Sequence, residues 1–231
     1  MLESIAFIPD GNRRYAKKEG ISFEQSYMQG VNKFWDILKW LSKYPSINTC
    51  TFYTFSLKNF ERSKDELDIL MRVFDKQLTR VIKDSLKETQ GARIKFFGHT
   101  YLFPKKLQEE MKQVEEKTSI YTDKVVNLAL GYDGQTEIMD AAKKFAKDVS
   151  LGKINPDTLT SEQFSKYLYS DFKAPDLIVR TSNEHRLSGF LTYQSSYSEF
   201  AFIDKYWPEL IESDIDKVVL GFEERERRFG K

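Results

Sequence analysis

The chain alternates between two patterns of apolar and polar positions. Short apolar runs recur along it, and most are separated by longer stretches in which an apolar residue returns every three or four positions. The short runs predict buried strands over residues 5–8, 49–55, 93–97, 125–130, 177–180 and 200–203. Strands that alternate with helices predict an α/β fold, here a central, mostly parallel six-stranded sheet flanked by helices.

The longer periodic stretches predict helices over residues 24–44, 64–86, 104–117, 135–149, 161–169 and 213–228, with Ser161 as the N-cap of the fifth. The first two carry broad apolar stripes, and each would be roughly 30 Å long at the rise of an α-helix. Such stripes are most simply explained by packing into the core. Two long apolar helices beside a sheet would also border an elongated hydrophobic tunnel, and the pattern alone leaves both interpretations open.

Composition narrows the class of protein. The 231 residues, 40% of them hydrophobic, fit a single domain over residues 1–231. The net charge of +1 gives no global positive field, so we expect no nucleic-acid partner and only a local anion site. Cys50 lies in an apolar run and is expected to be a reduced core residue. Because no apolar run approaches ~18 residues and no signal segment is visible, we expect a cytoplasmic protein.

A phosphate-binding pattern follows the first predicted strand, in the run Asp10-Gly11-Asn12-Arg13-Arg14. A strand followed by a glycine turn and a helix start directs free backbone N–H groups at an anion, and arginines add charge-assisted hydrogen bonds. Asp10 would repel a phosphate unless a divalent cation lay between them, and Mg²⁺ prefers one or two carboxylates plus phosphate oxygens. A helix capped by Asp or Asn and followed by solvated arginines fits the same residues equally well.

Polar residues also follow the other predicted strands. In parallel sheets, ligands bind at the carboxyl ends of the strands, so these residues are expected to share one edge. They include arginine, amide and hydroxyl side chains, which favour a phosphate-rich ligand: Ser56, Asn59, Arg62, Gly98, His99, Tyr132, Gly134, Arg180, His185, Arg186 and Ser188.

Simpler interpretations exist for several of these residues. Arg62 is spaced to pair with Glu66 one helical turn later, and His99 fits an ordinary turn residue. Glu199 lies in an aromatic stretch and needs a partner, which a metal, a subunit interface or a salt bridge would each supply.

Five ordered motifs now stand out, and with them the chain resembles the cis-prenyltransferases, which include undecaprenyl and dehydrodolichyl diphosphate synthases. The motifs extend over nearly the whole chain, so their combination is far more specific than any one of them. They are Asp10-Gly11-Asn12-x-Arg14, Phe55-Ser56-x-x-Asn59-x-x-Arg62, Asn127-x-Ala129-x-x-Tyr132-x-Gly134, the stretch from Pro175 through Gln194 to Glu199, and Arg225-x-Arg227-Arg228-Phe229-Gly230.

The resemblance implies a Mg²⁺-dependent homodimer that condenses isopentenyl diphosphate repeatedly onto an allylic prenyl diphosphate, giving a cis-polyprenyl diphosphate that serves as a glycan carrier lipid precursor. An enzyme that releases so apolar a product is also expected to contact the membrane surface peripherally, although the sequence shows no clear anchor. The implied catalytic residues are Asp10, Asn59, Ser56 and Arg62. The implied allylic diphosphate site is Gly11, Asn12, Arg13 and Arg14. The implied isopentenyl diphosphate site is Arg180, Arg186, Ser188, Arg228 and Gly230. The implied metal ligands are Asp10, Glu199 and His185.

The chain departs from the family pattern at the allylic end. Phe23 and Tyr27 stand where an Arg and a His are usual, which puts the allylic primer in doubt and suggests an archaeal branch. If the tunnel exists, Phe34, Trp35 and Phe74 are candidates to block its far end.

Two other functions compete with the enzyme. A catalytically silent partner subunit of a heteromeric prenyltransferase would keep the fold but lose the aspartate and the arginine–serine motif, both of which this chain retains. A phosphate- or RNA-binding module would need exposed aromatics over a basic groove.

Overall fold

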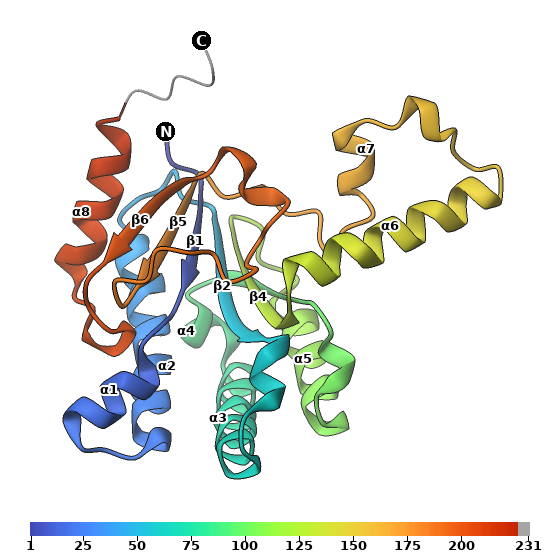
Figure 1. The fold of residues 1–231 in the computed structure, drawn as a ribbon. Coiled ribbons are helices and arrows are strands. Elements are labelled where there is room, and N and C mark those ends of the chain that lie inside the picture. The colour runs from blue at the N-terminus through green and yellow to red at the C-terminus, as the bar shows by residue number, and fades with distance from the viewer. Residues whose placement is uncertain (226–231) are drawn as a thin grey trace.

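The computed structural model describes residues 1–225, and these contain one six-stranded sheet (Figure 1). The strands are β1 Ser4–Ile8, β2 Thr49–Ser56, β3 Ala92–Phe97, β4 Lys124–Tyr132, β5 Leu177–Thr181 and β6 Glu199–Ile203. They lie in the order β3-β4-β2-β1-β5-β6, and every neighbouring pair is parallel. The predicted strands and fold class are confirmed, and the sheet described is parallel throughout.

Strand β1 lies at the centre of this sheet, and its apolar sequence suits that position. All of its residues are buried, and Phe7 pairs in register with Phe52 of β2 on one side and Val179 of β5 on the other. A strand with neighbours on both sides and cover on both faces needs a continuous apolar sequence. The chain leaves β1 toward β2 and later returns on the opposite side as β5. The carboxyl ends of β1 and β5 are therefore a topological switch point, where open parallel sheets bind ligands.

The helices differ in how they relate to the sheet. Helices α2, α3, α5 and α8 pack with one face of the sheet into the main core, whereas Figure 1 shows α6 projecting outward with α7 above it. Loop residues after α7 and β5, including Phe172, Phe190 and Leu191, contribute to the core on the other face. The helices are α1 Asn12–Glu19, α2 Phe23–Leu41, α3 Lys64–Lys83, α4 Ser85–Thr89, α5 Lys105–Thr118, α6 Gly134–Ser150, α7 Ser161–Ser165 and α8 Glu212–Glu223.

Four predicted helices differ from the observed ones, and the first of them, expected over 24–44, already ends at Leu41. The helix expected over 64–86 is interrupted at Asp84, whose extended backbone ends α3 and whose carboxylate accepts from the Lys87 N–H to cap α4. The helix expected over 161–169 ends at Ser165, and its N-cap is Thr160 rather than Ser161, in a reciprocal capping box with Gln163. The helix expected over 213–228 ends at Glu223, and its predicted last residues lie partly outside the described chain.

Candidate active site

The turn between β1 and α1 has a conformation that only glycine adopts easily. Gly11 has a φ of +102°, and a Cβ added to it would lie 2.2 Å from Ser182 Oγ and 2.7 Å from a ring carbon of Tyr206. Gly11 is also the N-cap of α1, and no side chain caps that helix. The expectation of an ordinary cap by Asp or Asn is therefore wrong. The first intrahelical bond runs from the Tyr15 N–H to the Gly11 carbonyl, which leaves the N–H groups of residues 12–14 for a ligand.

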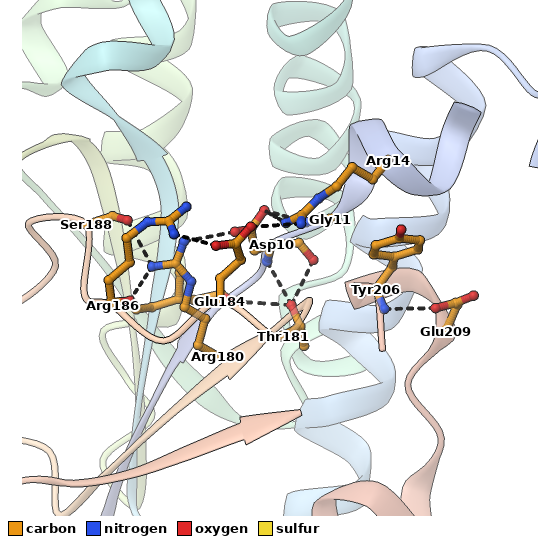
Figure 2. A network of polar contacts seen from close by, with 11 residues as sticks. Asp10, Gly11, Arg14, Arg180, Thr181, Glu184, Arg186, Ser188, Tyr206 and Glu209 are labelled. Atoms are coloured by element: carbon orange, nitrogen blue, oxygen red, sulfur yellow. Dashed lines mark hydrogen bonds and ion pairs between the residues drawn. The ribbon is translucent and has the colours of Figure 1, made fainter. Parts of the chain in front are cut away.

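Thr181, the last residue of β5, fixes this turn to the sheet. Its hydroxyl donates to the Asp10 carbonyl at 2.8 Å and accepts from the Asp10 N–H at 2.9 Å (Figure 2). The Asp10 carbonyl also accepts from the Trp207 N–H at 2.9 Å, in the 3-10 turn Trp207–Glu209. The position of the Asp10 carboxylate is thus set by two segments far away in the sequence.

The Asp10 carboxylate faces two arginines. Its Oδ2 accepts from Arg180 Nη2 at 2.9 Å, and its Oδ1 lies 3.2 Å from Arg14 Nη2 and accepts from the Gly11 N–H at 2.6 Å. Burial alone would raise the pKa of Asp10, but the hydrogen bond and charge of Arg180, the charge of Arg14 and the Gly11 N–H together outweigh burial. The pKa of Asp10 is consequently held below its ordinary value, and the carboxylate is ionised at neutral pH.

Arg180 is the most buried cation of this site, at 4% exposed. Besides Asp10, it donates to Ser188 Oγ at 2.9 Å and to the Arg186 carbonyl, and its Nε is buried without a partner among residues 1–225 (Figure 2). A buried guanidinium with an unused N–H and a single carboxylate neighbour is suited to bind a further anion. The structure thereby brings together Asp10, Arg180 and Ser188, as the sequence predicted.

Other predicted diphosphate ligands point elsewhere in this structure. The Arg186 side chain pairs with Glu184, which also binds Arg14 Nη1 at 2.9 Å. Arg13 is 58% exposed and lies 3.6 Å from Glu66. The side-chain oxygen of Asn12 is buried without a partner in the described part of the chain.

In the loop after β5, the sequence predicted Ser188 but did not single out Ser182 or Asn183 as site residues. Ser182, Asn183 and Ser188 all have positive φ, a costly conformation for residues other than glycine. Ser182 Oγ is buried beside Gly11 and has no hydrogen-bond partner among the residues described. Such strain and unsatisfied polarity are concentrated at functional sites, and the run of small polar residues after Arg180 was the available signal.

Arg62 belongs to a second polar cluster at the same edge of the sheet. Its Nη1 donates to Glu66 Oε1 at 2.9 Å, so the predicted ion pair is confirmed, and also to the Tyr27 hydroxyl at 2.8 Å. The Tyr27 hydroxyl in turn donates to Glu66, which is buried at 4% exposed. Burial, followed by the hydrogen bond to Glu66, raises the pKa of Tyr27, so its hydroxyl remains protonated and can donate. Nearby, Asn59 Oδ1 accepts from the Ser56 N–H at 2.9 Å.

These two clusters open onto one cavity of about 340 Å³. Its polar end is lined by the predicted catalytic residues Asp10, Ser56, Asn59 and Arg62 together with Arg180 and Ser188. The remaining wall is largely apolar and comes from α2, α3, α5 and the strands between them. The residues proposed to block a tunnel are part of this wall: Phe34, Trp35 and Phe74.

Known proteins resemble this chain in sequence and in fold. The family model Prenyltransf, which describes undecaprenyl diphosphate synthases, matches residues 8–230. The chain belongs to the cis-prenyltransferase family. It is 40% identical over 228 residues to the geranylgeranyl-diphosphate-specific tritrans,polycis-undecaprenyl-diphosphate synthase of Thermoplasma volcanium, covering 98% of this chain and 88% of the relative. It is 41% identical over 230 residues to the enzyme of the same name from Methanocaldococcus jannaschii, covering 98% and 82%.

A solved cis-prenyltransferase neighbour has the same fold. Lavandulyl diphosphate synthase from Lavandula x intermedia, crystallised with dimethylallyl diphosphate, superposes with a TM-score of 0.94 at 30% identity, covering 100% of this chain and 98% of that one. These likenesses indicate a prenyltransferase enzyme.

The three metal ligands predicted for this cis-prenyltransferase, Asp10, His185 and Glu199, do not form one cluster within the described residues. Glu199 is the first residue of β6, at the amino edge of the sheet, and pairs with Arg225 at 3.0 Å. Asp10 follows the carboxyl end of β1. His185 Nε2 lies 2.9 Å from Asn183 Oδ1, and its ring stacks on Phe202. Residues 1–225 contain no group of three His, Cys, Asp or Glu side chains able to hold a metal. Of the predicted ligands, Asp10 is the one that bonds Arg180.

The remaining predicted residues have other positions. His99 lies at the end of β3, where its Nε2 is within hydrogen-bond distance of Asp140 and Tyr169. Arg228 and Gly230 lie outside the described residues.

Proposed function

We propose that this cis-prenyltransferase condenses isopentenyl diphosphate repeatedly onto an allylic prenyl diphosphate to give a cis-polyprenyl diphosphate. The observation that carries the proposal is the junction of Asp10, Arg180 and Ser188 with a largely apolar cavity of about 340 Å³. One end suits a diphosphate and the other suits a hydrocarbon tail. The relatives named above support geranylgeranyl diphosphate as the primer.

In this proposal the allylic diphosphate binds the N-terminus of α1. The N–H groups of residues 12–14 and the helix dipole attract the anion, and Arg14 exchanges its contact with Asp10 for a phosphate oxygen. Arg180 and Ser188 bind isopentenyl diphosphate, with Arg186, Arg228 and Gly230 as further ligands once the loop after β5 rearranges. Each exchange replaces one charge-assisted bond with another, so the arginines remain paired throughout.

Asp10 is also the proposed Mg²⁺ ligand. Its side chain is 29% exposed and ionised, which suits a cation that takes one protein carboxylate and completes its coordination with phosphate oxygens and water. Mg²⁺, when bound, neutralises part of the diphosphate charge and stabilises the leaving group. His185 and Glu199 are not needed for such a site within one chain.

The chemistry follows from holding the two substrates against each other. The alkene of isopentenyl diphosphate attacks C1 of the allylic substrate, and the C1–O bond breaks with its electron pair leaving on the diphosphate. The new carbon–carbon bond is complete when a proton leaves the isopentenyl carbon chain and a double bond forms. Arginine stabilises the charge that develops on the leaving group, and the two binding sites supply orientation. Ser56, Asn59 and Arg62 lie beside the cavity and are proposed to assist proton removal, with a diphosphate oxygen as the base.

The proposal extends to the product and its surroundings. We propose a homodimer in which β6 lies near the interface, because Phe200 and Phe202 on this edge strand are each 39% exposed. No helix within residues 1–225 is long and apolar enough to cross a bilayer. Peripheral contact with a membrane would serve to release a polyprenyl product that acts as a glycan carrier precursor.

The test is synthesis from purified components. The protein is incubated with Mg²⁺, labelled isopentenyl diphosphate and, separately, geranyl, farnesyl and geranylgeranyl diphosphate, and products are extracted into butanol and sized. We expect a product ladder, strongest with geranylgeranyl diphosphate and abolished by chelation. Absence of product from folded protein with every primer would contradict catalysis and favour a non-catalytic partner subunit.

A further inference from the structure

A polar side chain lies deep on the apolar wall of the cavity, away from the diphosphate-type site. Gln77 of α3 is 9% exposed and lines the cavity. It is eleven residues after Glu66, which pairs with Arg62 at the polar end, so it lies roughly 16 Å farther along the helix axis. The other residues that α3 contributes to the cavity wall are apolar: Leu70, Val73, Phe74, Leu78 and Val81.

The orientation of the Gln77 amide is determined by its neighbours. Its Oε1 accepts from Trp35 Nε1 of α2 at 3.2 Å and from Arg80 Nη1 at 3.2 Å. Both neighbours can only donate, so the oxygen must face them and the NH₂ group must face away. Arg80 is held in place by Glu88 of α4 at 2.6 Å. The amide is therefore the centre of a bridge that joins α2, α3 and α4 beside the cavity.

The NH₂ group of Gln77 is left buried and without a partner among the described residues. A hydrocarbon that grows past this position must displace the amide and break the bridge to Trp35 and Arg80. This is unfavourable, because the buried Gln77 oxygen and its two donors would then lose their partners. Contact with the apolar residues nearer the polar end of the cavity carries no such penalty. There, each buried methylene makes binding of the chain more favourable.

We infer that Gln77, held by Trp35, limits the length of the chain that the cavity accepts, which makes it a specificity-determining residue for product length. This inference rests on the proposed function, since product length has meaning only for a growing prenyl chain. Growth is favourable while new units meet the apolar wall and slows when the chain end reaches the Gln77 amide. The length of the bound chain is thus limited by the hydrogen bonds of Gln77 as well as by the space in the cavity.

The first test compares product lengths. Gln77→Met keeps the length of the side chain and removes the amide, and Leu78→Met is the matched control on the same wall. The Gln77→Met product is expected to be longer than the wild-type product by at least one isopentenyl unit, and the Leu78→Met product unchanged. Trp35→Phe, which keeps an aromatic ring but frees the amide, is expected to broaden the length distribution. Equal product lengths for wild type and Gln77→Met would overturn the inference.

A second test does not need catalysis. Saturated alkyl monophosphates of increasing length are titrated into each variant by calorimetry. Affinity for the wild type should rise about fourfold per added methylene and then stop rising, whereas Gln77→Met should continue to longer chains. A plateau at the same length in both proteins would overturn the inference. A shifted plateau with no synthesis by any variant would uphold Gln77 as the limit on the length of the bound chain and would overturn the proposed function.

Discussion

Asp10 and Arg180 are joined by a hydrogen bond of 2.9 Å between residues at the carboxyl ends of two adjacent strands, β1 and β5. The pair lies at the topological switch point of the sheet, with the α1 N-terminus on one side and the cavity on the other. Because Arg180 is buried, Asp10 is the carboxylate that compensates its positive charge until another anion binds. The Asp10 carboxylate can therefore compensate the buried Arg180 in the folded protein and, in the proposed reaction, bind Mg²⁺.

Replacing Asp10 with Asn is expected to lower kcat by ~100-fold or more, because the ionised oxygen proposed to hold Mg²⁺ and balance the arginines is lost. Steady-state kinetics with labelled isopentenyl diphosphate at saturating Mg²⁺ measure the effect. Asp140→Asn is the control, since Asp140 bonds His99 and Tyr169 at a distance from the cavity. Equal activity of the two variants would contradict the role of Asp10.

The Asp10–Arg180 pair also predicts how stability depends on pH. The pKa of folded Asp10 lies below the ordinary value of about 3.9, so its stabilising contribution is complete above that pH and is lost as pH falls through the folded pKa. The difference in Tm between wild type and Asp10→Asn should therefore be constant from pH 7 to about pH 5 and shrink below about pH 4. Calorimetric scans over this range test it, and a difference that grew on acidification would have the wrong sign.

Gly11→Ala is expected to destabilise the fold by about 1–3 kcal/mol through backbone strain, with further loss from the clash with Ser182 and Tyr206. Gly20→Ala is the matched control, because Gly20 also has positive φ, +64°, but has no atom within 4 Å of the added Cβ. Chemical denaturation gives the free energy of unfolding of both variants. The difference between their losses separates backbone strain, which both have, from the steric clash that only Gly11→Ala has. If the two lost equal stability, the close approach of Ser182 would have no energetic consequence.

Tyr27→Phe removes a hydroxyl that accepts from Arg62 and donates to Glu66. We expect a loss of about 1–2 kcal/mol in stability and a several-fold fall in kcat/KM, because Arg62 loses one of the contacts that hold it beside the cavity. Tyr44→Phe is the control, since the Tyr44 hydroxyl bonds Asp216 away from the cavity. That variant should lose stability but keep its kcat/KM, and a parallel loss of activity would assign Tyr27 a purely structural role.

The sequence predicted the six strands because each is an apolar run that a parallel sheet buries on both faces. Asp10, Arg180 and Ser188 were predictable as neighbours because they lie at or after the ends of strands whose carboxyl ends must share an edge. Strand order was not predictable, so the contact of Thr181 with Asp10 could not be foreseen. Glu199 carried an unused signal: it directly precedes the last predicted strand, residues 200–203, and the start of a parallel strand lies at the edge opposite the site.

Helix ends were harder to predict than helices. Asp84 interrupts an apolar stripe that continues on both sides of it, and only its backbone conformation separates α3 from α4. The stripes of α2 and α3 likewise did not distinguish core packing from a cavity wall, because both place apolar residues on the same helix face. Gln77 fell within one such stripe, and its partner Trp35 is 42 positions away along the chain.

The most direct test of the central claim is a crystal structure of the protein with Mg²⁺, isopentenyl diphosphate and an unreactive thiolo analogue of geranylgeranyl diphosphate. The account predicts the allylic diphosphate on the N–H groups at the start of α1, isopentenyl diphosphate on Arg180 and Ser188, and the prenyl tail between α2 and α3, directed toward Gln77. A tail lying outside this cavity, or diphosphates bound away from Asp10 and Arg180, would contradict it.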